Sequence, residues 1–123
     1  MNRTKAHNDL VQDILIAISQ FQSVRAWSNP TGYARAMSDT DVIVKYGMKG
    51  SADIIGIFQW NGVGLFLAIE VKTGTARQTV LQKNFMAMIR RLGGVYIVAR
   101  NLKQALDAIE QVLQKGPRAE FSA

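Results

Sequence analysis

The sequence predicts an α/β fold, a mixed central β-sheet flanked by helices, in a single domain over residues 1–123. Two apolar runs joined by Asn61-Gly62 predict a β-hairpin, because Asn-Gly is the strongest short hairpin signal. A helix-period segment between this hairpin and a further apolar run implies a crossover, and a crossover joins parallel strands. The sheet is therefore expected to contain both antiparallel and parallel pairs.

The N-terminal half is expected to begin with a helix over residues 8–21, where apolar residues recur at helical spacing. Residues 23–27 are predicted to form a short strand, which the turn signal Ser28-Asn29-Pro30-Thr31-Gly32 ends. A polar loop follows up to residue 40, and residues 42–45 are expected to form a brief edge strand.

The hairpin strands are predicted over residues 53–59 and 64–71, separated only by Trp60-Asn61-Gly62-Val63. Asp53 precedes the turn by about as many residues as Glu70 follows it, so the two acids are expected at matched depth on paired strands.

Helix and strand alternate in the remainder of the chain. Residues 77–92 carry an apolar stripe at helical spacing and end at Gly93-Gly94. Residues 95–99 are an apolar run typical of a buried strand. Asn101 is expected to cap a last helix over residues 102–115.

Asp53, Glu70 and Lys72 are the candidate chemical residues. Side chains alternate along a strand, so Glu70 and Lys72 project from one face, and the hairpin brings Asp53 beside them. Two carboxylates can hold Mg²⁺, and a neighbouring lysine can act on a water beside a phosphate. The alternative, a turn acid and a surface ion pair, fits less well, because charges after an apolar, central-strand run are costly to bury.

Fifteen basic residues against nine acidic ones give a net charge of +6, which favours a polyanionic partner such as nucleic acid. A merely solvated basic surface is the alternative. The absence of cysteine excludes a disulfide framework and a thiolate zinc site and fits a reducing cytosol. The first residues lack a signal-peptide core, and no apolar run is long enough to span a bilayer, so we expect a cytoplasmic protein with no membrane partner.

The chain resembles the PD-(D/E)XK nuclease superfamily and, within it, the small stand-alone VRR-NUC domains of phages and bacteria. The matching segments follow one another over most of the chain: Asn29-Pro30-Thr31-Gly32, Gly50-Ser51-Ala52-Asp53-Ile54-Ile55-Gly56, Ile69-Glu70-Val71-Lys72-Thr73-Gly74, Gln82 and Gly93-Gly94-Val95. The resemblance implies a restriction-endonuclease-like αβββαβ core. It also implies action in the cytoplasm of a bacterium or of a phage-infected host.

By position, the resemblance implies that Asp53 and Glu70 ligate Mg²⁺ or Mn²⁺ together with the Val71 carbonyl. Lys72 would act on the attacking water, and Gln82 would support the site from its helix. Family members of this kind are associated with homodimers that cut branched DNA, especially four-way junctions.

Two positions depart from the family pattern. Ala52 stands where the superfamily has proline, and Asn8 and Asp9 are the nearest matches to the glutamate usually supplied by the first helix. A non-catalytic nucleic-acid-binding module on a degenerate nuclease fold therefore stays an alternative. A restriction-type enzyme fits less well, because 123 residues leave no room for an appended recognition domain.

Residues near the acids are the preferred candidates for DNA contacts, and these are Arg35, Lys49, Ser51 and Arg77. His7, the only histidine, is expected to be a solvated N-terminal residue that cannot by itself support a histidine–metal cluster. Trp27 is expected in the core and Trp60 beside the hairpin turn.

Overall fold

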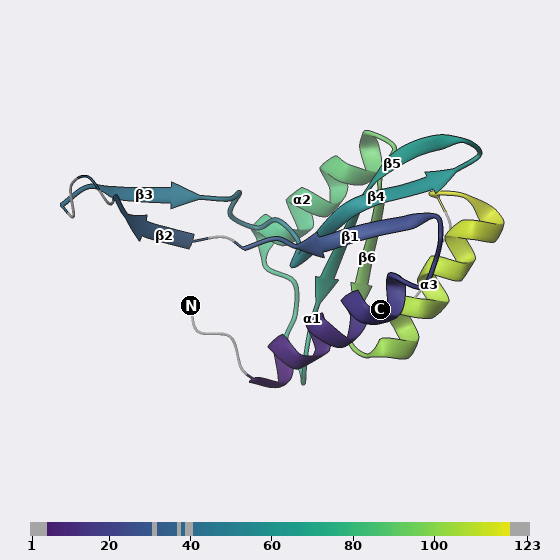
Figure 1. The fold of residues 1–123 in the computed structure, drawn as a ribbon, viewed down its shortest axis with the longest axis horizontal. Helices are drawn as coiled ribbons and strands as arrows, with labels where there is room; N and C mark the ends of the chain where they lie inside the picture. The colour runs from purple at the N-terminus through teal and green to yellow at the C-terminus, as the bar shows by residue number, and fades with distance from the viewer. Residues whose placement is uncertain (1–4, 31, 37, 39–40, 119–123) are drawn as a thin grey trace.

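A computed structural model describes residues 5–30, 32–36, 38 and 41–118 (Figure 1). The elements in chain order are α1 (Lys5–Ile18), β1 (Val24–Ser28), β2 (Gly32–Arg35), β3 (Ile43–Tyr46), β4 (Ile54–Trp60), β5 (Val63–Val71), α2 (Val80–Arg91), β6 (Val95–Ala99) and α3 (Leu102–Lys115). None of the helices in this described part of the chain has the length and apolar composition of a membrane-spanning segment.

The main sheet has four strands in the order β1-β4-β5-β6. β1 pairs with β4 and β4 with β5 in antiparallel orientation, whereas β5 and β6 are parallel. The predicted mixed sheet is therefore confirmed. Asn61 and Gly62 form the hairpin turn with φ angles of 51° and 76°, the left-handed values that a two-residue turn of this kind requires.

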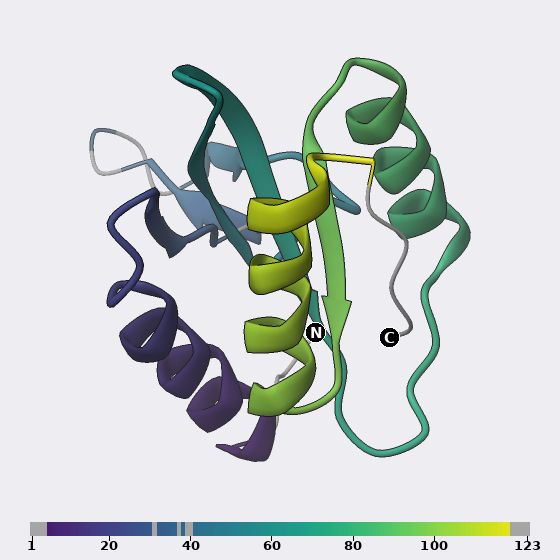
Figure 2. The same ribbon diagram turned by 90° about the vertical axis from the view of Figure 1, so that its right-hand side faces the viewer.

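Helices cover the sheet on both faces (Figure 2). α1 and α3 lie against one face and against each other, over a core that includes Ile14, Phe58 and Ile69. α2 lies on the other face, where Phe85 and Ile89 pack against Ala68 and Tyr96. Successive residues of β5 therefore point to different helices, and the end of β5 is buried on both faces.

α2 covers only part of its face of the sheet. Trp27, Ile57 and Phe66 are 49%, 51% and 44% exposed. The prediction that Trp27 belongs to the core is wrong, because its register opposite Ile55 directs it to the part of this face that α2 leaves open.

β2 and β3 form a separate two-stranded ribbon that extends from the body of the molecule (Figure 1). The prediction of a loop was wrong for Gly32–Arg35, and the predicted strand at 42–45 pairs with this segment rather than with the main sheet. Residues 37, 39 and 40 of that predicted loop lie outside the described part of the chain.

The helix boundaries differ from the predicted ones at two helices. α1 begins at Lys5 and ends at Ile18, earlier than predicted at both ends. α2 begins at Val80 rather than at residue 77, because Thr79 is its N-cap. α3 and its Asn101 cap match the prediction, since the Asn101 side chain accepts a hydrogen bond from the backbone of Gln104.

Candidate functional site

Asp53 lies immediately before β4 and is 6% exposed. Ile54 pairs with Ile69 at the end of the β4–β5 ladder, so Asp53 stands one residue beyond that pair, opposite Glu70. Its Oδ2 atom accepts a 2.8 Å hydrogen bond from the backbone N–H of Val71. The aspartate is thus held against the Glu70–Val71 peptide, at the matched depth that the hairpin predicts.

Asn29, at the end of β1, holds the segment that carries Asp53. Its side-chain amide donates to Ser51 Oγ and to the Ala52 carbonyl, each at 2.9 Å, and its backbone N–H donates to the Asp53 carbonyl at 2.8 Å. The turn signal in the sequence indicated that β1 ends here, but it did not indicate this support.

Glu70 is 2% exposed and shares its face of β5 with Ala68, which packs below α2. Gln82 Nε2 donates to Glu70 Oε1 at 3.3 Å, and Gln82 Oε1 accepts from Lys72 Nζ at 2.7 Å. The same Oε1 accepts the backbone N–H of Thr79 at 2.8 Å, and Thr79 Oγ1 accepts the backbone N–H of Gln82, which completes a capping box. The helix N-terminus thereby sets the orientation of the amide between Glu70 and Lys72.

The two carboxylates have different neighbours. Asp53 Oδ2 accepts the Val71 N–H and lies 3.5 Å from His7 Nε2 of α1, whereas Glu70 and Lys72 both form hydrogen bonds with Gln82 of α2. Among the residues that the structure describes, no three His, Cys, Asp or Glu side chains form a metal-binding cluster. The described candidate residues are connected by hydrogen bonds, Asp53 to the β5 backbone and both Glu70 and Lys72 to Gln82. They do not form a metal-binding cluster of this kind in the described structure.

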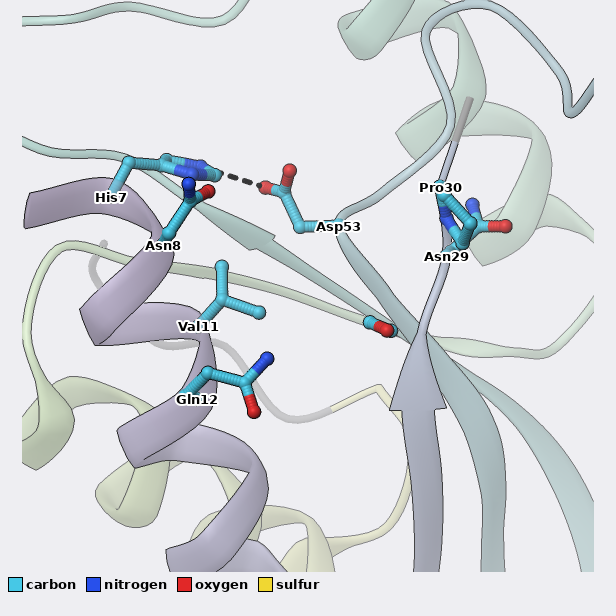
Figure 3. A pocket seen from close by; sticks show the side chains of 8 residues that line it. His7, Asn8, Val11, Gln12, Asn29, Pro30 and Asp53 are labelled. Carbon is cyan, nitrogen blue, oxygen red and sulfur yellow. Dashed lines mark ion pairs between the residues drawn. The ribbon is translucent and has the colours of Figure 1, made fainter. Parts of the chain in front are cut away.

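His7 lies at this site rather than in solvent, so the prediction for it is wrong. Its side chain is 13% exposed, and Nε2 is 3.5 Å from Asp53 Oδ2 and 3.0 Å from the Val71 carbonyl oxygen (Figure 3). The reason is the earlier start of α1, which brings residue 7 into the helix. His7 precedes the buried residues Val11, Ile14 and Ile18 at helical spacing, and this spacing is the sequence signal that could have identified it.

A pocket of about 230 Å³ opens beside Asp53 (Figure 3). It lies between α1 and the end of β1 and is lined by His7, Asn8, Val11, Gln12, Ser28, Asn29, Pro30 and Asp53. Asp9 is not among these residues, since it is 59% exposed and pairs with Lys5 at 2.7 Å. Of the two residues that match the first-helix glutamate, it is therefore Asn8 that adjoins the site.

The candidate DNA contacts lie on separate segments. Arg35 is exposed on β2, Lys49 is exposed in the turn before Ser51, and Arg77 is exposed between β5 and α2. Ser51 is only half-buried, and its hydroxyl accepts the hydrogen bond from Asn29.

No sequence pattern distinguishes Tyr96, which lies beneath α2 with 1% exposure. Burial raises the pKa of its hydroxyl above the ordinary value, and the negative charge of Glu70 adds to this effect. Its ring contacts Phe85 edge to face, with ring centroids 6.1 Å apart, and lies 5.9 Å from the Arg90 guanidinium. Tyr96 therefore gives Glu70 a neutral, buried neighbour.

Comparison with protein-family models finds none that matches the chain, and comparison with curated proteins finds no match either.

Proposed function

We propose that this chain is a divalent-metal-dependent endodeoxyribonuclease of the VRR-NUC type. The observation that carries the proposal is the hydrogen bond from the Val71 N–H to Asp53, which puts one carboxylate against the peptide that follows the other. The resemblance of the surrounding motifs and the mixed sheet of the fold support the same class. A net charge of +6 suits a nucleic-acid substrate.

The donor set suits a hard divalent cation. Asp53 and Glu70 supply carboxylate oxygens and Val71 supplies a carbonyl oxygen, which are the ligand types that Mg²⁺ and Mn²⁺ take in proteins. These residues would hold the ion. When bound, the ion would supply positive charge beside the phosphate and make a nearby water more acidic.

Lys72 would act directly on the reacting groups. Its ammonium group can donate hydrogen bonds to the attacking water or to a phosphate oxygen and stabilise the negative charge that develops there. The 2.7 Å hydrogen bond to Gln82 restrains this group, so that less rotational freedom is lost when the substrate arrives. Gln82 would be a positioning residue, since it acts through Lys72 and Glu70.

We propose branched DNA, such as a four-way junction, as the substrate and a homodimer as the working unit in a bacterial or phage-infected cytoplasm. Symmetric cleavage of a junction needs two sites related by a two-fold axis. Sedimentation under active conditions tests the dimer, and a strictly monomeric active enzyme would reject the paired-cut version while leaving the nuclease assignment in place.

A non-catalytic nucleic-acid-binding module is the second candidate, favoured by Asn8 and Asp9 standing where the family has a glutamate. Both candidates would bind DNA in a salt-dependent manner, with affinity falling about a thousandfold between about 50 and 200 mM salt for about six phosphate contacts. Salt dependence therefore does not separate them.

Product formation does separate the two candidates. The purified chain is incubated with single-stranded, duplex, flap and four-way-junction DNA, with Mg²⁺, with Mn²⁺ or with a chelator. The nuclease proposal expects cleavage only with a divalent ion and fastest cleavage of the branched substrates. Binding without cleavage under every metal condition would favour the binding module.

A further inference from the structure

His7 Nε2 faces two of the oxygen atoms that the proposed function gives to the cation. It is 3.0 Å from the Val71 carbonyl oxygen and 3.5 Å from Asp53 Oδ2, and its side chain is 13% exposed. From this arrangement we propose that His7 is itself a ligand of the divalent cation, a proposal that rests on the proposed function. The site would then be a mixed nitrogen and oxygen site rather than an all-oxygen one.

The two distances from His7 Nε2 are compatible with a shared ion. Ligands at about 2.1 Å from a six-coordinate ion lie about 3.0 Å apart when they are neighbours, and about 3.4 Å apart around a tetrahedral ion. The two distances from Nε2 fall near these values. Each oxygen atom therefore lies from His7 Nε2 at a separation that two ligands of one ion can have.

The chemistry of the imidazole permits this role. A neutral histidine carries its proton on either ring nitrogen, and the tautomer protonated on Nδ1 leaves the lone pair of Nε2 available to a metal. In the other tautomer, Nε2 donates its N–H to the Val71 carbonyl instead. Exchange between the tautomers changes no net charge, so the same side chain can hold the end of β5 before the ion binds and ligate the ion afterwards.

The surroundings of His7 keep it in place and leave room for further ligands. Val11, one turn further along α1, is buried in the core, which anchors this part of the helix. The pocket beside Asp53 has a volume of about 230 Å³ and is lined in part by Asn8 and Gln12, so water can complete the coordination shell.

A nitrogen ligand changes the preferred metal. Mg²⁺ favours oxygen ligands, whereas imidazole favours first-row transition ions. We therefore expect the chain to bind Mn²⁺ more tightly than Mg²⁺, with His7 responsible for much of the difference.

The test uses the full chain without DNA and Mn²⁺ as the probe. His7→Gln is the informative variant, because a glutamine amide can still donate to the Val71 carbonyl but is a poor metal ligand. His7→Ala removes both the hydrogen bond to the Val71 carbonyl and the metal ligand. Asp53→Asn removes a ligand that the proposed function assigns. Calorimetry measures Mn²⁺ and Mg²⁺ affinity, pulsed electron paramagnetic resonance detects nitrogen bound to Mn²⁺, and thermal melting monitors the fold.

We expect His7→Gln to melt close to the wild type, to bind Mn²⁺ at least about tenfold more weakly and to change Mg²⁺ affinity less. The wild type should show imidazole nitrogen coupling to Mn²⁺, and His7→Gln should lack it. Unchanged Mn²⁺ affinity in His7→Gln, together with a wild-type spectrum without nitrogen coupling, would overturn the role of His7. If that result comes with loss of Mn²⁺ binding in Asp53→Asn, the proposed function stands. If the wild type binds neither ion, both proposals fail.

Discussion

Lys72 Nζ donates a 2.7 Å hydrogen bond to Gln82 Oε1, and the same oxygen accepts the N–H of Thr79, the N-cap of α2. A group on which the proposed chemistry depends is thus restrained by the start of a helix. Gln82 also donates to Glu70 at 3.3 Å, so one amide connects the carboxylate and the ammonium group of the Glu-Val-Lys motif. Substitutions around this amide can separate its structural role from its positioning role.

Gln82→Leu and Thr79→Ala form a matched pair. Each removes half of the capping box and should lower the free energy of unfolding by about 1 kcal/mol. Only Gln82→Leu also removes the hydrogen bonds from Gln82 to Lys72 and Glu70. It should therefore reduce the single-turnover cleavage rate at least about tenfold, whereas Thr79→Ala should stay close to the wild-type rate. Urea denaturation and cleavage assays check both values. Equal cleavage rates in the two variants would show that Gln82 only caps the helix.

Asn29→Ala should destabilise the chain more than Ser51→Ala. The first variant removes two hydrogen bonds, to Ser51 Oγ and to the Ala52 carbonyl, and the second removes only one. At about 1 kcal/mol for each hydrogen bond, we expect losses of about 2 and about 1 kcal/mol in urea denaturation. A loss in Asn29→Ala no larger than that in Ser51→Ala would contradict the anchoring role of Asn29.

Gly50→Ala should be more harmful than Gly62→Ala, although both glycines have positive φ, at 87° and 76°. A Cβ atom at Gly50 would lie 2.7 Å from Leu81 Cβ on α2, whereas one at Gly62 meets nothing within 4 Å. The backbone conformation alone costs about 1 kcal/mol, and the overlap at Gly50 adds about 1–3 kcal/mol. Chemical denaturation of both variants measures the difference. Similar losses of unfolding free energy in Gly50→Ala and Gly62→Ala would mean that α2 moves aside without an energetic cost.

Tyr96 should make the chain sensitive to alkali. Burial, with a contribution from Glu70, raises the pKa of this hydroxyl in the folded state. The folded state therefore binds the proton more tightly than the unfolded chain, whose tyrosine pKa is about 10. The resulting stabilisation is complete below about pH 10 and is lost as the pH rises above that value.

The variant Tyr96→Phe isolates this effect, because the other tyrosines are unchanged. The free energy of unfolding, measured between about pH 8 and 11, should decline less steeply above about pH 10 in Tyr96→Phe than in the wild type. Parallel curves for the two proteins would contradict the raised pKa.

Much of the fold could be predicted because its signals are local. The Asn61-Gly62 turn and the Asn101 cap each depend on residues a few positions apart, and both are confirmed. β2 could not be predicted, because Gly32–Arg35 lacks the run of branched residues that indicates a strand, and its partner β3 supplies the pairing. The exposure of Trp27 depends on how far α2 extends across the sheet, which no local pattern encodes.

The candidate site was only partly predictable for a similar reason. The depth of Asp53 on the hairpin follows from counting residues, since register is set by the turn. The position of His7 depends on where α1 begins, and α1 has no acidic residue in its first turn to mark that point. The contact between His7 and Asp53 also joins distant parts of the chain, which only the packed structure brings together.

The most direct test of the proposed nuclease compares junction cleavage by the wild type with Asp53→Asn, Glu70→Gln and Lys72→Met, in Mg²⁺ and in Mn²⁺. Lys103→Met is the control, because Lys103 is an 83% exposed lysine of α3 that is paired with Asp107. We expect at least about a hundredfold slower cleavage in each of the three site variants, with DNA binding and melting near wild type, and an unchanged rate in Lys103→Met. Cleavage at the wild-type rate by the variant that carries all three site substitutions would contradict the assignment.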